Sequence, residues 1–255
     1  MNAVPTISIE ALTERDIAKT IDHSLLRPEL DDAFIEDGCR LAAEYDVASV
    51  CVRPADVRRA AAILAGTDVA VGTTIGFPHG GHTTATKVDE ARRALADGAR
   101  ELDMVMQIGA LKSGWDADVQ ADITAVVEVA HAAGAIVKVI FENAYLTDDE
   151  KIRACHLSEA AGADFVKTST GFAPSGATHD DLRLMRANTS SQIGVKAAGG
   201  VRTLDGLLEV MALGVTRIGA TQTKAIIDDF RGRKGIGTPV AAATGGTSGL
   251  TGEGS

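Results

Sequence analysis

Short runs of apolar and β-branched residues alternate along the chain with longer segments in which apolar positions repeat at the helical period. Apolar runs bounded by turn residues are typical of strands that are buried on both faces, as in parallel sheets. Eight runs are predicted as strands: Ala18–Asp22, Ala48–Arg53, Val69–Gly76, Glu101–Met106, Ile136–Glu142, Phe165–Thr170, Gly194–Ala198 and Arg217–Thr221. The helices predicted between them include Asp31–Tyr45, Thr84–Ala96, Asp116–Ala133, Asp149–Ala161, His179–Arg186 and Leu204–Leu213.

A unit of helix, glycine and strand recurs along the chain. Several helical segments begin at a threonine that can cap a helix, namely Thr147, Thr178 and Thr203. Glycines suited to end a helix stand before the next strand at Gly66, Gly98, Gly134, Gly162 and Gly214. Eight strands that alternate with eight helical segments predict parallel pairing through crossover helices. The count and the length favour a single α/β domain, a (β/α)8 TIM barrel over residues 1–231, rather than an open doubly wound sheet.

The C-terminal segment departs from this pattern. Residues 232–255 hold eight of the 27 glycines, show no apolar periodicity and contain no aromatic residue. Such a composition buries too little apolar surface to offset the entropy of an ordered chain, so we expect a flexible tail and no second domain.

Composition and charge narrow the class of protein. The chain has 255 residues, 45% of them hydrophobic, and 25 Lys and Arg against 35 Asp and Glu give a net charge of −10. An acidic chain is not expected to bind nucleic acid through a basic surface. We expect no membrane span and no secretory signal, because no apolar run is long enough and the N-terminus lacks a basic start. Three cysteines, Cys39, Cys51 and Cys155, form no paired motif, which favours a reducing cytoplasm.

Charged residues interrupt four of the predicted strands, where a barrel should be apolar. They are Asp103, Lys138, Lys167 and Lys196, on the fourth to seventh strands. An unpaired buried charge costs several kcal/mol, so these side chains need a reason to be there. One hypothesis is a structural ion-pair network. The other is catalysis, which we favour because Asp103 alone cannot neutralise three ammonium groups; Glu142 ends the fifth strand, but its direction is not fixed by the sequence.

The chemistry that suits neighbouring buried lysines is Schiff-base catalysis. A free lysine has a pKa near 10.4 and is neutral in only about one part in 2,500 at pH 7, yet the neutral amine is the nucleophile. A second ammonium group nearby lowers that pKa. A carboxylate such as Asp103 can then relay protons through water. The residues alone leave open which of Lys138, Lys167 and Lys196 forms the imine.

Six segments closely resemble the motifs of the deoxyribose-phosphate aldolase family. They are IDHSLLRPE (21–29), SVCVRP (49–54), IGFPHGGHTTATKVDEA (75–91), ELDMVMQIGAL (101–111), DFVKTSTGF (164–172) and VKAAGGVRT (195–203). The resemblance runs from about residue 17 to 230 and implies a class I aldolase, a lyase on a (β/α)8 barrel. The implied reaction is the reversible cleavage of 2-deoxyribose 5-phosphate to acetaldehyde and glyceraldehyde 3-phosphate. By the same resemblance, Lys167 is the Schiff-base lysine, Lys196 the lysine that tunes it and Asp103 the proton-relay acid, with no metal and no cofactor.

Phosphate binding is predicted in the loops that follow the last three strands. Barrels often bind phosphate there through backbone N–H groups and helix N-termini. The candidates are Gly171, Gly199, Gly200, Thr221 and Gln222. Two adjacent glycines alone also suit a simple tight turn. The family often has a serine pair where this chain has Thr221 and Gln222, so the threonine keeps a hydroxyl donor and the glutamine departs from the pattern.

Four further residues are candidates for substrate contact. Asp22, placed at the end of the first strand, is expected to bind either a substrate hydroxyl or a structural water. Cys51 suits a buried apolar position as well as the edge of a pocket. Lys138 and Thr170 complete the set. His79 and His82, with two glycines between them, are not expected to hold a metal, since no third ligand stands nearby.

Two other functions stay open at this point. One is another Schiff-base barrel aldolase that acts on a different sugar phosphate. The other is a non-catalytic barrel that binds phosphosugars, which has no reason to keep Asp103, Lys167 and Lys196 buried. Base rates for enzymes favour a homodimer, and the expected partners are sugar phosphates and small aldehydes.

Overall fold

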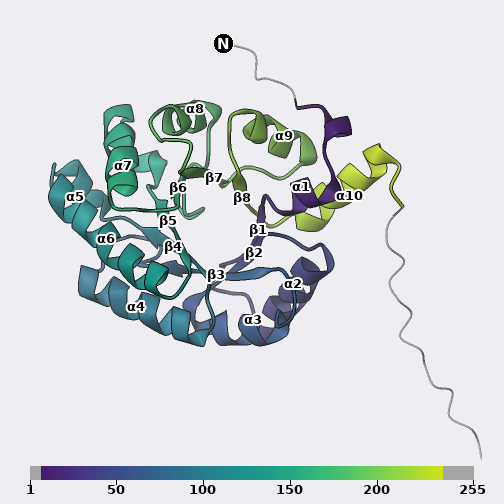
Figure 1. Ribbon diagram of the computed structural model, residues 1–255, viewed down its shortest axis with the longest axis horizontal. Helices are drawn as coiled ribbons and strands as arrows, with labels where there is room; N and C mark the ends of the chain where they lie inside the picture. The colour runs from purple at the N-terminus through teal and green to yellow at the C-terminus, as the bar shows by residue number, and fades with distance from the viewer. Residues whose placement is uncertain (1–6, 238–255) are drawn as a thin grey trace, which may run out of the picture.

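Eight parallel strands form one closed barrel and pair in chain order, from β1 round to β8 and back to β1. The computed structural model describes residues 7–237. The strands gather at the centre of the molecule and the helices surround them (Figure 1). This architecture confirms the predicted (β/α)8 barrel. The strands are β1 Ile21–Leu25, β2 Ser49–Val52, β3 Ala70–Ile75, β4 Glu101–Val105, β5 Ile136–Ile140, β6 Phe165–Lys167, β7 Gly194–Ala198 and β8 Arg217–Ala220.

The helices fill the connections between the strands. The described α-helices are α1 Glu14–Ala18, α2 Asp32–Glu44, α3 Val57–Ile63, α4 Thr84–Asp97, α5 Ile108–Lys112, α6 Asp116–Ala132, α7 Asp148–Ala160, α8 His179–Ala187, α9 Leu204–Ala212 and α10 Thr223–Lys234. Short 3-10 helices lie at η1 Ile9–Ala11, η2 Pro54–Asp56 and η3 Asn143–Tyr145.

Local signals in the sequence set many of the helix ends. The hydroxyls of Thr147, Thr178 and Thr203 accept backbone N–H groups at the starts of α7, α8 and α9, as predicted. All five glycines predicted to end helical segments have a positive φ. Gly98 is typical: it has a φ of 114° directly after α4, a backbone conformation that residues other than glycine rarely adopt.

The core lies on both sides of the barrel wall. Apart from Ile136, the apolar side chains of β2, β4, β5 and β7 are buried, and the inner faces of the helices pack over the strands. Parallel strands covered in this way need apolar residues on both faces, which is why the strand segments stand out as nearly continuous apolar runs. The charged residues inside these strands are therefore the exceptions that define the site.

Several boundaries differ from the sequence prediction, mostly by one or two residues, and the sixth strand ends at Lys167 rather than at the predicted Thr170. The first strand was predicted at Ala18–Asp22, but β1 spans Ile21–Leu25, because Thr13 and Asp16 form a capping box that starts α1 and takes Ala18 into that helix. At the other end, α10 continues through Lys234, three residues into the predicted tail, and Arg231 on α10 pairs with Glu14 on α1 at 2.6 Å. Residues 238–255 of the predicted tail lie outside the described residues.

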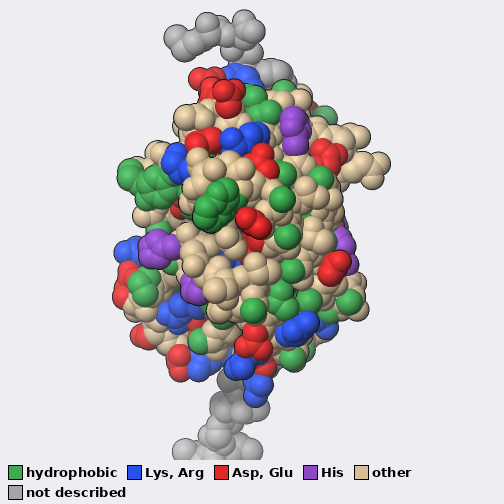
Figure 2. Space-filling view, turned by 90° about the vertical axis from the view of Figure 1, so that its left-hand side faces the viewer, with side chains coloured by type: hydrophobic (Ala, Val, Ile, Leu, Met, Phe, Trp, Pro, Cys, Tyr) green, Lys and Arg blue, Asp and Glu red, His purple; other side chains and the backbone are tan. Residues whose placement is uncertain are grey.

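The surface carries both signs of charge. On the face shown in Figure 2, basic and acidic side chains are interspersed, and no large basic patch is seen on that face. Across residues 7–237, no helix is long and apolar enough to cross a membrane.

Candidate active site

Four charged side chains from neighbouring strands meet inside the barrel. Asp103 on β4, Lys138 on β5, Lys167 on β6 and Lys196 on β7 are all at most 3% exposed. Strand pairing sets Asp103 opposite Lys138, and Lys167 opposite Lys196. Side chains at paired positions of adjacent parallel strands point to the same face, so the register brings the four groups into one interior cluster.

Asp103 is the carboxylate that joins the lysines. Its Oδ2 accepts hydrogen bonds from Lys167 Nζ at 2.6 Å and from Lys196 Nζ at 2.7 Å. Lys138 Nζ lies 3.0 Å from Asp103 Oδ1, which is close enough for charge pairing. Within the described part of the chain, however, no donor is aligned for a hydrogen bond to Oδ1. Asp103 therefore binds two amines through Oδ2 and faces the third, that of Lys138, with Oδ1.

A second group of charges completes the cluster toward the starts of the strands. Asp22 Oδ2 lies 2.5 Å from Lys196 Nζ and 3.0 Å from Lys138 Nζ. Glu101, the first residue of β4, accepts a hydrogen bond from Lys138 at 2.5 Å. Arg217, the first residue of β8, donates to Asp22 and also to Glu101, the latter at 3.0 Å.

The count of charges corrects one premise of the sequence analysis. Asp103 is not the single carboxylate among the lysines, since Asp22 and Glu101 share the same network. The cluster thus has four basic groups, counting Arg217, and three carboxylates. Full ionisation would leave one positive charge inside the barrel, where it is costly. A neutral amine at one lysine leaves three positive and three negative charges.

The environment of Lys167 favours its neutral form. Burial lowers the pKa of Lys167 and the neighbouring Lys196 lowers it further, while Asp103 opposes the shift without cancelling it. Burial also acts to lower the pKa of Lys196, but Asp103 and Asp22 together raise it above its ordinary value. The pKa of Lys138 is likewise raised, because Asp103, Asp22 and Glu101 outweigh the effect of burial. Lys167 is therefore the lysine of the cluster with the lowest pKa, and the one that loses its proton most readily.

A cavity of about 470 Å³ opens above Lys167 at the carboxyl ends of the strands. Lys167 is the member of the charge cluster that lines it. Five other predicted site residues line the same cavity: Thr170, Gly171, Gly199, Gly200 and Thr221. The structure thus brings the predicted phosphate loops and Lys167 to a single pocket. The sequence pattern alone did not distinguish Lys167 from Lys138 and Lys196.

Backbone geometry suits the rim of this cavity to an anion. Gly171, Gly199 and Gly200 have φ values of 89°, 77° and 110°, a backbone conformation that favours glycine, so no side chain grows from these three residues at the rim. The helix α9 begins at Leu204, just after the two glycines, and its N-terminus carries partial positive charge.

Two arginines at this rim were missed in the sequence analysis. Arg27, in the loop after β1, and Arg202, after the glycine pair, are exposed and line the cavity. Arg27 Nη2 also lies 2.7 Å from Glu29 Oε1. Arg202 lies two residues after Gly200 of the predicted phosphate loop, so its position in the sequence was a usable signal. Arg27 lies far from that loop in the chain, and only the closed barrel brings it near.

The remaining candidates lie in or beside this arrangement. Asp22 was placed at the end of the first strand, but it is the second residue of β1 and lies in the ion network. Cys51 is buried on β2, and burial together with Asp103 raises the pKa of its thiol to about 11. Gln222 stands at the N-cap position of α10 and is not among the residues that line the cavity. Within residues 7–237, no group of three or more His, Cys, Asp and Glu side chains is placed to hold a metal.

These features place a buried lysine with a lowered pKa at one end of an α/β barrel, beneath a rim of glycine loops and arginines. Residues 17–237 match the DeoC/LacD family of aldolases. The chain belongs to this family and is therefore an aldolase, a lyase that acts on carbon–carbon bonds. Family membership confirms the resemblance seen in the sequence motifs and removes the alternative of a non-catalytic barrel.

Relatives and solved structures agree with this assignment. A deoxyribose-phosphate aldolase of Rhodopirellula baltica is 52% identical over 231 residues, which cover 90% of this chain and 95% of the relative. One of Clostridium perfringens is 48% identical over 217 residues, with 85% and 96% covered. A crystal structure of a putative deoxyribose-phosphate aldolase from Coccidioides immitis superposes with a TM-score of 0.83 at 42% identity, and covers 89% of this chain and 88% of its own.

Proposed function

We propose that the protein cleaves 2-deoxy-D-ribose 5-phosphate reversibly to D-glyceraldehyde 3-phosphate and acetaldehyde, through an imine at Lys167, in deoxyribonucleotide catabolism. The observation that carries the proposal is that Lys167, the lysine with the lowered pKa, lines the cavity whose rim is built from glycine loops and arginines. The names of the relatives at about half identity support the same substrate.

The reaction begins at the nitrogen of Lys167. Its neutral amine attacks C1 of the open-chain sugar, and loss of water gives an iminium that accepts electrons. The proton of the C3 hydroxyl leaves, the C2–C3 bond breaks and its electron pair moves to the iminium. Glyceraldehyde 3-phosphate departs and an enamine remains. Protonation of the enamine at C2, followed by hydrolysis, releases acetaldehyde and restores the amine.

In this proposal Asp103 and Lys196 move these protons. Lys196 and Lys167 both donate to Oδ2 of Asp103, so a proton that leaves one amine has a partner within hydrogen-bond distance. In this proposal a water molecule passes protons between the reacting group and the carboxylate of Asp103. Asp22 and Lys138 hold the charges of this relay in place from below, which is a supporting role rather than substrate contact.

An assay of the two directions tests the substrate. The purified chain should release acetaldehyde from 2-deoxyribose 5-phosphate, and it should condense acetaldehyde with glyceraldehyde 3-phosphate. If dihydroxyacetone phosphate served as donor and acetaldehyde did not, the protein would be the alternative, a barrel aldolase for another sugar phosphate.

The assembly and the compartment are part of the proposal. We infer a homodimer in the cytoplasm; the three cysteines are all free and buried, which suits a reducing compartment. A solved relative from Aeropyrum pernix, with a TM-score of 0.80 at 28% identity over 86% of this chain and 92% of its own, is described as a tetramer. Light scattering on the purified chain gives the mass that decides between these states.

A further inference from the structure

Glu142 is a buried acidic residue that the aldolase mechanism above does not use. It follows β5, is 2% exposed and has a φ of 58°, in the left-handed region that residues other than glycine rarely adopt. Such a backbone persists only where the surrounding contacts fix it, and residues of this kind cluster at functional sites. The contacts of its carboxylate show what it fixes.

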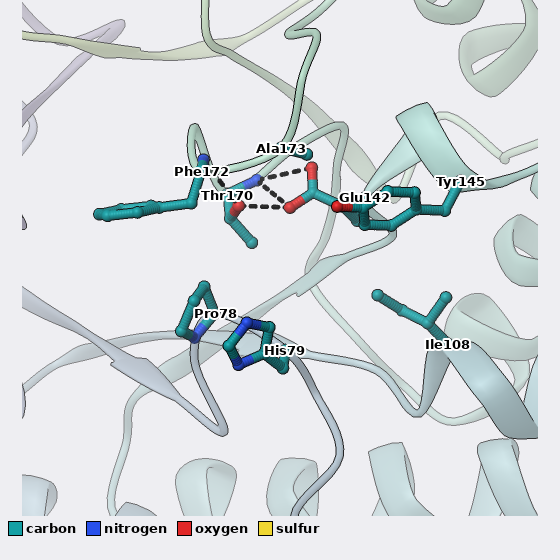
Figure 3. A pocket seen from close by; sticks show the side chains of 8 residues that line it. All are labelled: Pro78, His79, Ile108, Glu142, Tyr145, Thr170, Phe172 and Ala173. Atoms are coloured by element: carbon teal, nitrogen blue, oxygen red, sulfur yellow. Dashed lines mark hydrogen bonds between the residues drawn. The ribbon is translucent and has the colours of Figure 1, made fainter.

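The carboxylate of Glu142 accepts hydrogen bonds from the loop that follows Lys167. The backbone N–H of Thr170 donates to Oε1 at 3.2 Å and to Oε2 at 3.3 Å, and the hydroxyl of Thr170 also donates to Oε2. That hydroxyl in turn accepts the N–H of Phe172 at 3.0 Å. Figure 3 shows this chain of hydrogen bonds from Glu142 through Thr170 to Phe172.

The loop bound by Glu142, residues 170–172, lies between Lys167 and the glycine rim of the active site. It follows the end of β6, where Lys167 lies. Gly171, between Thr170 and Phe172, lines the cavity together with Gly199 and Gly200. The ring of Phe172 packs edge-on against Phe77 at a centroid distance of 5.4 Å, which ties the loop to the one after β3. Glu142 itself lines a separate, smaller pocket on the other side of Thr170, and not this cavity.

We propose that Glu142 is a positioning residue that fixes the 170–172 loop through Thr170 and thereby sets the preference of the enzyme for phosphorylated sugars. The hydroxyl of Thr170 has its proton committed to Glu142 and a lone pair committed to Phe172, so Thr170 acts through the loop rather than by donating to the substrate. The imine chemistry does not depend on this contact, because Lys167 is held by the barrel strands and by Asp103.

Glu142→Gln tests the inference, which rests on the proposed function. The amide keeps the shape of the carboxylate but loses its charge, and it must turn one N–H₂ toward the donors of Thr170. We expect the KM for 2-deoxyribose 5-phosphate to rise about tenfold, with kcat and the rate on unphosphorylated 2-deoxyribose each within about threefold of wild type. Trapping of Lys167 by acetaldehyde and borohydride should be unchanged.

Three further variants separate positioning from other effects. Thr170→Val removes the hydroxyl with little change in shape and should repeat the KM effect, whereas Thr170→Ser, which keeps the hydroxyl, should restore most of the affinity. Glu150→Gln is the matched control, because Glu150 accepts the N–H of Thr147 in the same manner at the start of α7, away from the cavity. Glu150→Gln should leave both activities as in wild type.

The outcomes that overturn the inference differ from those that overturn the proposed function. An equal loss on the phosphorylated and unphosphorylated sugars, or loss of imine trapping in Glu142→Gln, would make Glu142 part of the chemistry or of the general fold. A wild-type enzyme inactive on 2-deoxyribose 5-phosphate would overturn the function alone. In that case calorimetric binding of inorganic phosphate still tests the loop: we expect about tenfold weaker binding to Glu142→Gln than to wild type, and equal binding would contradict us.

Discussion

At the scale of single residues, the lowered pKa of Lys167 comes from the surroundings of its ammonium group. Burial and the neighbouring Lys196 both disfavour that charge, and Asp103, which favours it, is shared with Lys196 on the same oxygen. The four charged residues on the fourth to seventh strands could be identified from the sequence because charges inside apolar strand segments are rare.

Replacing Lys196 should change the pH dependence of imine formation. Lys196→Leu removes a positive charge beside Lys167, so the pKa of Lys167 should rise and the half-maximal pH for trapping acetaldehyde should increase by about one unit. Activity at pH 7 should fall at least about tenfold. Trapping rates measured from pH 6 to 10 check this, and an unchanged profile would show that Lys196 has no influence on the ionisation of Lys167.

His23 shows a residue-scale effect on stability. It is buried, its Nδ1 lies 2.9 Å from Thr223 Oγ1, and burial lowers the pKa of its ring to about 4. A depressed pKa means that the unfolded chain takes up the proton first. Stability that is full above about pH 6.5 is therefore lost as the pH falls toward 4, by about 2–3 kcal/mol at pH 4.5.

The variant His23→Gln isolates this loss. It removes the titrating ring, so its free energy of unfolding should decline less than that of wild type between pH 7.5 and 4.5, when both are measured by urea denaturation. Parallel declines in the two proteins would place the acid sensitivity in other groups.

At the scale of elements, the repeated unit of helix, glycine and strand was enough to predict the barrel. Each glycine ends a helix at a positive φ, and the next apolar run enters the sheet. The first strand was misplaced because the apolar Ala18 lies only three residues before Ile21, and the capping box at Thr13 that assigns it to α1 acts over only three residues. Asp22 was consequently predicted at the wrong end of its strand.

The loops after the strands make a prediction about phosphate. Arg202 is exposed at the rim of the cavity, two residues after Gly200 and two before the start of α9. Arg202→Gln should raise the KM for 2-deoxyribose 5-phosphate about tenfold and should change the rate on 2-deoxyribose by less than about threefold. Steady-state kinetics on the two sugars decide, and a similar loss on both would move the phosphate contact elsewhere.

At the scale of the whole molecule, the charge cluster depends on residues that are far apart in the chain. Arg217 and Asp22 are 195 positions apart, and Arg217 and Glu101 are 116 apart. Arg217 and Glu101 stand at the first positions of their strands, where a charge is ordinary, so nothing in the sequence marked them as members. Only closure of the barrel brings β1, β4 and β8 to one interior.

The C-terminal segment provides a test of domain organisation. Its composition predicts no contribution to the core, whereas α10 is tied to α1 by the pair of Arg231 and Glu14. Removal of residues 238–255 should leave the melting temperature within about 1 °C of the full chain, because no apolar periodicity is lost. A drop of several degrees in calorimetry would show that this segment packs on the barrel.

The central claim is that Lys167 forms the imine, and one measurement tests it directly. The full chain is incubated with acetaldehyde, reduced with borohydride and mapped by peptide mass spectrometry, with Lys167→Leu as the matched variant. We predict one two-carbon adduct, on the lysine of the segment DFVKTSTGF (164–172), and neither adduct nor turnover in the folded variant. An adduct on Lys138 or Lys196, or a Lys167→Leu protein that still cleaves the sugar, would contradict the account.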